Sequence, residues 1–323
     1  MVNDFRRFSK NEIERLVWCL EIPEKVSADN KIYEPDGVAL CMLLARLAWP
    51  HRLADMHLEF GWKPERVSRI TNTLLRWIYD RWHHLLGFDS ERLTPERLAM
   101  YSMAIKEKNA PLESCWGFVD GTLRPIARPI YGQEAVYNGW KRFHCFKYQG
   151  IIAPDGIITH LYGPVEGRIH DSTVWMESGM SEILDTYAYA PNGAPLQIYG
   201  DQAYGISDHL ISPFAGATVT QEQREWNKAM SQVRIVVEWC FKEVLQLFSA
   251  LDFTRTQRCL LSPIGLQYPV AVLLYNAHVC LHHPQITQYF EREHELNLAG
   301  QEDIPELCKP PTLEEYFHYE DDD

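Results

Sequence analysis

The stretch RFHCFKYQGIIAPDGIITHLYGPV, residues 142–165, decides the fold of this chain. It holds two runs rich in aromatic and β-branched residues, 142–154 and 156–165, and each run predicts a β-strand. The sequence Pro154-Asp155-Gly156 lies between them and is typical of a tight turn. We therefore expect two consecutive strands joined by this turn.

Further strands and helices are predicted on both sides of this segment. CWGFVDGT (115–122) predicts a strand before it, and residues 170–184 predict a helix after it. PLQIYGDQAYG (195–205) predicts a fourth strand, and residues 227–248 form a strongly amphipathic helical pattern. The order strand, strand, strand, helix, strand, helix is that of a ribonuclease H-like core. We expect an α/β fold with a mixed sheet over residues 111–255.

The first part of the chain, residues 1–110, predicts an all-helical unit, with apolar residues spaced three and four apart as in Leu40, Leu43, Leu44 and Leu47. Within it, residues 51–82 have the outline of a helix-turn-helix, with a turn at Gly61 and a second helix from near Pro64. On that helix Arg66 and Arg69 could contact DNA. The alternative is a helical hairpin with a solvated basic face.

Length and composition exclude several classes of protein. The 323 residues are 46% hydrophobic and 23% charged, which is typical of a soluble globular protein of about two domains. The longest apolar stretch, around 270–280, is interrupted by Asn276 and His278 and is shorter than the ~20 residues of a membrane span. The charged first residues do not resemble a secretory signal, so we expect an intracellular protein with reduced cysteines.

Charge is distributed unevenly along the chain. The net charge is −13, but residues 1–100 hold 15 basic and 15 acidic residues, and residues 101–260 hold 14 and 17. Residues 261–323 hold only 2 basic and 12 acidic residues, so most of the negative charge belongs to this C-terminal segment. We expect a C-terminal helical segment and a solvated acidic tail over 256–323. The overall charge therefore does not exclude DNA as a ligand.

Three carboxylates follow predicted elements at places where they could meet. Asp120 ends the first strand, Asp201 ends the fourth, and Glu238 lies on the long helix after it. In a ribonuclease H-like sheet the first and fourth strands are neighbours, so the two aspartates would meet at the rim and the helix would bring the glutamate over them. Divalent cations prefer oxygen ligands, and phosphodiester cleavage with two metals needs several such groups.

Each carboxylate also has a structural alternative. Asp120-Gly121 and Gly200-Asp201 are common turn dipeptides. Glu238 lies four residues from both Arg234 and Lys242, as in a surface ion-pair ladder. The coincidence of all three at these positions favours the metal site.

Five further residues near these segments are candidates for supporting or DNA-binding roles. Asp171 could be an N-cap or a supporting carboxylate, and His170 could contact a phosphate. Lys141, Arg142 and Lys147 are interleaved with aromatic residues, which predicts phosphate contacts with base stacking. The alternative for this cluster is an edge strand with its basic side chains turned outward.

These motifs together resemble a known family, the Harbinger-type DDE transposases and their derived nucleases. The resemblance lies in VDGT (119–122), the block 137–172, YGDQAYG (199–205), NKAMSQVRIVVEWCF (227–241) and PPTLEEYF (310–317). It implies that Asp120, Asp201 and Glu238 are the catalytic triad. Trp140 and Ile169 depart from the usual pattern, at positions outside this triad.

The resemblance implies an Mg²⁺- or Mn²⁺-dependent DNA endonuclease with two metal ions. It would cut double-stranded DNA at the terminal repeats of an element and transfer the freed 3′-hydroxyl to a target strand. It also implies a nuclear location and a Myb-like accessory protein, and the reaction at two element ends favours a homodimer or larger assembly. A domesticated DNA-binding or scaffold protein that no longer cuts is the alternative, and an unrelated metal-dependent phosphoesterase is a more distant one.

Overall fold

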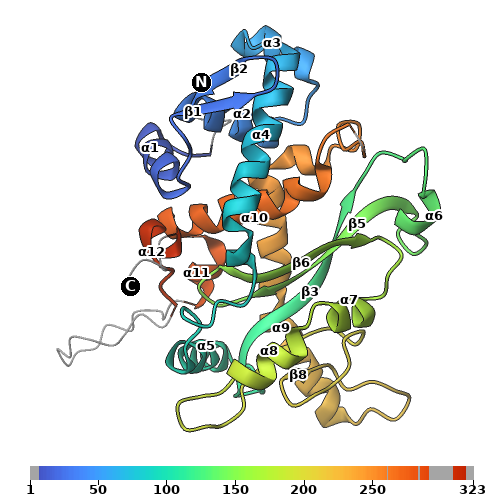
Figure 1. Cartoon of the computed structure of the whole chain (residues 1–323). Coiled ribbons are helices and arrows are strands. Elements are labelled where there is room, and N and C mark those ends of the chain that lie inside the picture. Colours follow the sequence, from blue (N-terminus) through green and yellow to red (C-terminus); the bar gives the residue numbers. More distant parts are fainter. Residues whose placement is uncertain (1–6, 260, 283, 291–307, 318–323) are drawn as a thin grey trace, which may run out of the picture.

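The computed structural model describes residues 7–259, 261–282, 284–290 and 308–317. The chain forms a helical N-terminal unit, a mixed sheet with helices, and a C-terminal group of helices (Figure 1). Much of the acidic tail predicted within 256–323 falls on 291–307 and 318–323, outside the described residues. The predicted unit boundaries at 110 and 255 stay predictions.

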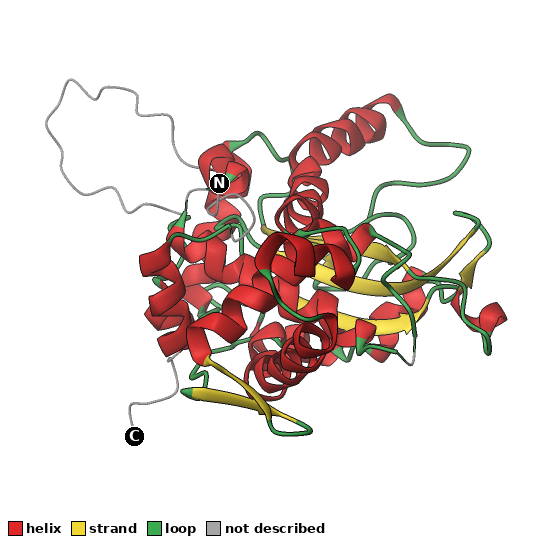
Figure 2. Ribbon diagram, turned by 90° about the horizontal axis from the view of Figure 1, so that it is seen from above, coloured by secondary structure: helices red, strands yellow, loops and turns green. Residues whose placement is uncertain are grey.

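The N-terminal unit contains five α-helices, a short 3-10 helix and one small hairpin. These elements are α1 (Lys10–Cys19), β1 (Lys25–Ala28), β2 (Ile32–Pro35), α2 (Asp36–Ala48), α3 (Leu53–Phe60), α4 (Pro64–Trp82), η1 (His83–Leu86) and α5 (Pro95–Glu107). The prediction of an all-helical unit is wrong at the β1–β2 hairpin, which Figure 2 shows apart from the main sheet. Strands of four residues are too short for their alternation to be separated from a helical pattern.

The segment predicted to be a helix-turn-helix folds as α3 and α4. Gly61 lies between them with φ 71°, a left-handed conformation that glycine adopts without strain. Pro64 occupies the first helical position of α4, where its missing N–H costs nothing. Val67, Ile70 and Leu74 are buried, so one face of α4 packs into the protein and the other is free to carry arginines.

The mixed sheet follows the predicted order of elements, and the α/β, ribonuclease H-like fold prediction is confirmed. Its elements are β3 (Cys115–Pro125), α6 (Gln133–Val136), β4 (Tyr137–Asn138), β5 (Phe143–Ile152), β6 (Ile158–Glu166), α7 (Asp171–Glu177), α8 (Met180–Tyr187), β7 (Gln197–Tyr199), β8 (Leu210–Ile211) and α9 (Gln221–Leu247). β5 pairs antiparallel with both β3 and β6, while β7 runs parallel to β3 and β8 parallel to β7. β3 is therefore the central strand.

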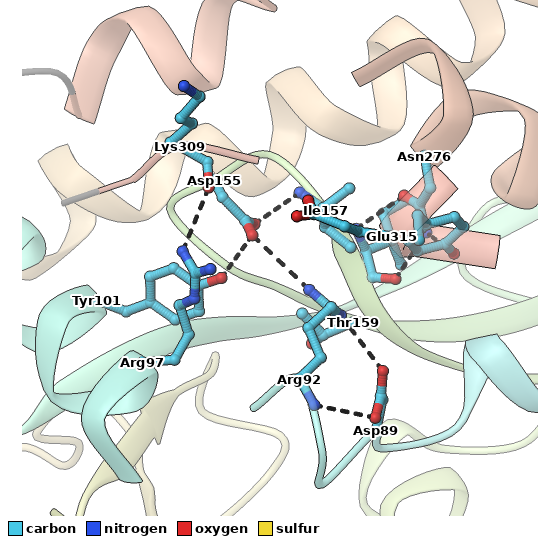
Figure 3. Close-up of polar contacts among 12 residues, drawn as sticks. Asp89, Arg92, Arg97, Tyr101, Asp155, Ile157, Thr159, Asn276, Lys309 and Glu315 are labelled. Atoms are coloured by element: carbon cyan, nitrogen blue, oxygen red, sulfur yellow. Dashed lines mark hydrogen bonds and ion pairs between the residues drawn. The ribbon is translucent and has the colours of Figure 1, made fainter. Parts of the chain in front are cut away.

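The turn between β5 and β6 is fixed by buried polar contacts (Figure 3). Asp155 is 1% exposed; its carboxylate accepts hydrogen bonds from the Tyr101 hydroxyl and from the Ile157 N–H. The Arg92 guanidinium lies 3.7 Å from the same carboxylate. The hydroxyl of Thr287 donates to the Asp155 carbonyl at 3.1 Å. The predicted turn thus also ties α5 and the C-terminal helices to the sheet.

The C-terminal elements are η2 (Ser249–Asp252), α10 (Ile264–Leu281), α11 (Gln285–Phe290) and α12 (Leu313–Phe317). By length and composition α10 could cross a membrane, but 72% of it is buried inside the protein, as in the core helix of a soluble protein. Asn276 of α10 bonds to both backbone groups of Ile158 in β6. The helix also packs against α4, so it joins the sheet to the N-terminal unit.

The acidic C-terminal segment is in part a packed element. Leu313, Tyr316 and Phe317 of α12 are buried, and the Phe317 ring lies 5.1 Å from that of Trp82 at the end of α4. Glu314 forms an ion pair with Arg15 of α1 at 2.7 Å. The expectation of a solvated tail is therefore wrong for residues 313–317.

Candidate active site

An open cleft of about 1010 Å³ lies along the second half of β3. Its walls come from β3, from the turn 138–143, from the loop before α7 and from the chain after β7. Residues of both charges line it, among them Asp120, Arg124, Lys141, Lys147, Arg168, Asp171, Asp201 and Asp252. It holds most of the residues predicted for the site.

Sheet pairing brings the first two predicted carboxylates together. Phe118 of β3 lies opposite Tyr199 of β7 in parallel register, and Asp120 and Asp201 each follow two residues later. Asp201 begins a turn in which its carboxylate accepts a hydrogen bond from the N–H of Ala203 at 2.9 Å. The predicted neighbourhood of the first and fourth strands is therefore observed.

Asp171 is closer to Asp120 than the sequence suggested. It is the first residue of α7, and its Oδ1 would lie 2.6 Å from a Cβ placed on Gly121. Only a residue without a side chain leaves room for this carboxylate against β3. The glycine of VDGT thus allows Asp171 to reach the cleft beside Asp120.

The electrostatic surroundings of Asp120 are unusual for a carboxylate. Burial raises its pKa to about 6, and the negative charges of Asp201 and Asp171 add to this increase. The Arg234 guanidinium, 3.0 Å from Oδ2, and the Gly121 N–H, 2.9 Å from Oδ1, act in the opposite direction. Like charges are therefore held close together, and Arg234 of α9 neutralises part of their charge.

Tyr204 lies among the same three carboxylates. Burial raises the pKa of its phenol, and the charges of Asp171, Asp120 and Asp201 raise it further. Its hydroxyl is buried and, within the described part of the chain, has no hydrogen-bond partner. A protonated phenol can donate one hydrogen bond, so Tyr204 is placed to orient a carboxylate or a phosphate oxygen.

Lys147 fixes the orientation of Asp171. It is 6% exposed, and its ammonium lies 3.1 Å from Oδ1 of Asp171 and donates to the Ile169 carbonyl. These contacts hold the loop before α7 onto β5. The predicted DNA-binding role of Lys147 stays a prediction, and its ammonium already has two partners inside the cleft.

Glu238 is placed differently from the aspartates. It lies on α9 one turn after Arg234; its side chain is exposed, and it does not line the cleft. Its assignment to the triad stays a prediction. His170 precedes α7, is exposed and lines the cleft. It is therefore placed to contact a ligand in the cleft, and it takes no part in the hydrogen bonds of the aspartates described above.

The other predicted DNA contacts lie at two surfaces. Lys141 and Arg142 are exposed on the turn after β4, next to Trp140, which is 87% exposed. Arg66 of α4 forms an ion pair with Glu34 and donates to the Tyr33 carbonyl at 2.9 Å, while Arg69 is half-buried. Among the described residues no ion pair holds Lys141 or Arg142, whereas Arg66 is held by the β1–β2 hairpin.

The donor set fits divalent cations in its chemistry. Carboxylate oxygens are the ligands that Mg²⁺ and Mn²⁺ prefer, and a cation would relieve the repulsion that raises the pKa of Asp120. Within the ranges that the structure describes, no three His, Cys, Asp or Glu side chains are close enough to hold one metal ion. The carboxylates would have to approach each other, with Arg234 withdrawn from Asp120.

Two residues of this site were missed in the sequence. Tyr204 follows Asp201 by three residues, and its place in the turn could have marked it. Arg234 precedes Glu238 by one helical turn and was interpreted only as a partner for that glutamate. The contacts of Tyr204 and Arg234 with the aspartates depend on how the turn and α9 are oriented toward β3. A local sequence pattern does not contain this information.

Comparison with known proteins agrees with this geometry. Residues 119–276 match the family described as DDE superfamily endonuclease. A probable transposase for insertion sequence element IS702 from Microchaete diplosiphon is 28% identical over 165 residues. The alignment covers 50% of this chain and 57% of that relative. No solved structure matches. The central part of the chain, which carries all four acidic candidates, is thus similar to DDE superfamily endonucleases.

Proposed function

We propose that this protein is a DDE transposase of the Harbinger type that cuts double-stranded DNA at the terminal repeats of an element. The observation that carries the proposal is the convergence of Asp120, Asp171 and Asp201 in one open cleft. Asp120, Asp201 and Glu238 are the catalytic ligands in this proposal, and Asp171 supports them. Two divalent cations held there would activate the attacking water or 3′-hydroxyl and stabilise the leaving oxygen.

The protein's own side chains have distinct tasks in this reaction. Lys147 holds Asp171 in its orientation, and Gly121 leaves the space for it. Arg234 pairs with Asp120 and would have to withdraw from it for a cation to bind there. Lys141, Arg168 and His170 lie at the cleft and would contact phosphates of the DNA. Trp140 offers an exposed ring for base stacking.

The test is Mn²⁺-dependent cleavage of labelled duplex DNA that carries the terminal repeats of the source element. Asp120→Asn, Asp171→Asn, Asp201→Asn and Glu238→Gln are compared with the wild type. Asp208→Asn, an exposed aspartate outside the cleft, is the matched control. Loss of cleavage in Asp120→Asn and Asp201→Asn, with full activity of the control, supports the proposal. Equal cleavage by all variants overturns it.

The ion pair between Arg234 and Asp120 supports one alternative, a domesticated DNA-binding or scaffold protein that does not cut. In that protein the arginine would be a permanent counter-ion rather than an exchangeable one. A titration with Mn²⁺ distinguishes the nuclease from the non-cutting protein. Mn²⁺ can bind at Asp120 and raise the unfolding temperature only if it can replace Arg234 there. Absence of both stabilisation and cleavage would favour the non-cutting alternative.

The proposal extends to assembly and location. Cutting at two element ends requires two active sites, so we propose a homodimer or larger assembly. The near-neutral N-terminal unit supports dependence on a Myb-like accessory protein for DNA binding. The resemblance to Harbinger-type transposases is the basis for proposing a nuclear location. Sedimentation with and without duplex DNA tests the assembly, and a pull-down with a candidate Myb-like protein tests the partner.

A further inference from the structure

A second cavity, of about 150 Å³, lies between the N-terminal unit and the segment that joins η2 to α10. Side chains of α2 and α4 line one wall, and residues between 256 and 267 line the other. Arg46 and Arg258 are its charged residues, and none of the lining residues is acidic. It shares no lining residue with the cleft of the aspartates.

Arg46 is a half-buried charge that has no carboxylate partner among the described residues. It lies in the last turn of α2, and burial lowers the pKa of its guanidinium. One N–H donates to the His51 carbonyl at 3.2 Å, and no ion pair joins it to an acidic residue in the described ranges. A guanidinium has five N–H donors, so this single bond leaves most of its capacity for a ligand. An unpaired, partly buried cation favours an anion as that ligand.

The rest of the cavity supplies further donors. Arg258 is exposed, and its Nε donates to the Arg255 carbonyl at 3.2 Å. Ser68, Asn72 and Ser262 add hydroxyl and amide groups that can donate to an oxyanion. The forked guanidinium matches the geometry of a phosphate. The cavity is larger than the space that a few water molecules need, and smaller than a typical binding site for a whole small molecule. Its volume therefore suits a single phosphate group.

The chain connects this cavity with the cleft. Asp252 lines the cleft, and six residues later Arg258 lines the second cavity. Between them the carbonyl of Gln257 accepts from the Ala127 N–H at 2.8 Å, and its side chain donates to Gln267 at 3.0 Å. The opposite wall is α4, the helix predicted to meet DNA. A duplex that lies in the cleft and extends along residues 252–258 would reach this cavity.

We propose that the cavity binds one backbone phosphate of the DNA that is cut in the cleft, with Arg46 and Arg258 as its ligands. The assignment rests on the proposed function only in taking DNA as the source of the phosphate. The two cavities would then fix the duplex at two points, one on each side of residues 252–258.

The test measures binding of duplex DNA by fluorescence anisotropy without divalent metal, over a range of salt concentrations. Arg258→Ala should lower the affinity about three- to tenfold, equally for specific and unrelated sequences, because a phosphate contact carries no sequence information. Arg255→Ala is the matched control: it removes an exposed arginine three residues away that does not line the cavity. Equal binding by Arg258→Ala, Arg255→Ala and the wild type would overturn the proposal.

A double variant, Arg46→Met with Arg258→Ala, tests how many DNA phosphates the cavity contacts. The slope of log affinity against log salt should become shallower by about 0.9, as expected for the loss of one phosphate contact. Arg258→Ala alone keeps the test valid if the double variant does not fold. Inorganic phosphate is titrated in parallel at constant ionic strength. Stabilisation by free phosphate together with unchanged DNA binding in Arg258→Ala would assign the cavity to a free anion and overturn the DNA assignment.

Cleavage separates this inference from the proposed function. If the proposed function fails, the wild type does not cut, although the variants still differ in DNA binding. If the inference fails, the wild type cuts and Arg258→Ala binds DNA as the control does. The two results are therefore distinguishable in one set of proteins.

Discussion

Asp120 lies on β3 and Asp155 lies in the turn between β5 and β6 of the same sheet, yet their surroundings are opposite. The carboxylate of Asp155 is buried and meets a guanidinium, a hydroxyl and a backbone N–H (Figure 3). Asp120 faces the negative charges of Asp201 and Asp171 with one arginine and one N–H as partners. The first is a satisfied group that stabilises a turn, and the second belongs to a cluster of three carboxylates that ion-pairs with only two cations in the described part of the chain, Arg234 and Lys147.

The difference shows how the surroundings of an aspartate distinguish a structural role from a functional one. A buried carboxylate with a full set of donors contributes to a unique packing arrangement, and removing it leaves its partners unpaired. Carboxylates that repel each other in an open cleft cost stability and are retained for binding. Four substitutions test this contrast, in order of expected effect.

The largest effect is expected for Asp120→Asn. Cleavage should fall on the order of 10³- to 10⁴-fold, about 4–5 kcal/mol of activation free energy, because the amide is a poor ligand for divalent cations. The unfolding temperature should change little, since the amide oxygen can still accept from the Gly121 N–H. Single-turnover cleavage and thermal unfolding check both parts. Cleavage within tenfold of the wild type would contradict the contrast.

Asp155→Asn should show the reverse behaviour. It should destabilise the protein by about 3 kcal/mol, because it removes the more deeply buried of the two carboxylates that pair with Arg92 and leaves only Asp89, at 3.6 Å. Cleavage per folded molecule should stay unchanged. Urea unfolding measures the loss, and Tyr101→Phe, which removes one donor to the same carboxylate, should give a smaller loss of about 1–2 kcal/mol. Unchanged stability of Asp155→Asn would show that the network is not needed for folding.

His160 of β6 is a third case, a buried titratable group without a partner. It is 6% exposed, its Nδ1 has no hydrogen-bond partner in the described ranges, and burial lowers its pKa from 6.5 to about 4. The unfolded chain therefore binds the proton more readily. Its contribution is fully present above pH 6.5 and is lost as the pH falls towards 4, by at most about 3 kcal/mol.

The measurement is the free energy of unfolding between pH 7 and pH 4 for the wild type and His160→Gln. The variant should lose stability less steeply over this interval. Part of the slope should remain, because burial also lowers the pKa of His278 to about 4. Identical slopes for the two proteins would contradict the assignment of this pH dependence to His160.

The smallest effect is expected for Gly121→Ala. The added methyl group would lie 2.6 Å from Oδ1 of Asp171 and should displace that carboxylate, so cleavage should fall roughly tenfold, about 1.4 kcal/mol. Gly37→Ala is the control, because a Cβ at Gly37 meets no atom within 4 Å. Cleavage kinetics of both variants decide the matter. Equal activities would show that the position of Asp171 is not critical.

The central sheet could be predicted from the sequence because its strands are long and the turn between β5 and β6 has a characteristic sequence. The runs 142–154 and 156–165 each exceed the length at which alternation is recognisable, and Pro154-Asp155-Gly156 permits little but a turn. The short β1–β2 hairpin lacked both signals. α12 carried a signal that composition concealed: Leu313, Tyr316 and Phe317 have helical spacing among acidic residues.

The candidate site was predictable only where it follows from strand order. Asp120 and Asp201 become neighbours as soon as the first and fourth strands pair. Asp171 begins α7, and its approach to β3 depends on the space at Gly121 and on the contact with Lys147. Such contacts are set by tertiary packing between segments far apart in the chain, which periodicity does not encode.

The packing of α12 against α1 and α4 also has a consequence for synthesis on the ribosome. Trp82 is buried in the folded protein beside Phe317, and Arg15 is paired with Glu314. Both N-terminal partners emerge from the exit tunnel long before the residues that contact them. A nascent chain that stalls before residue 308 would present the apolar surface around Trp82 to chaperones, a surface that the completed fold covers.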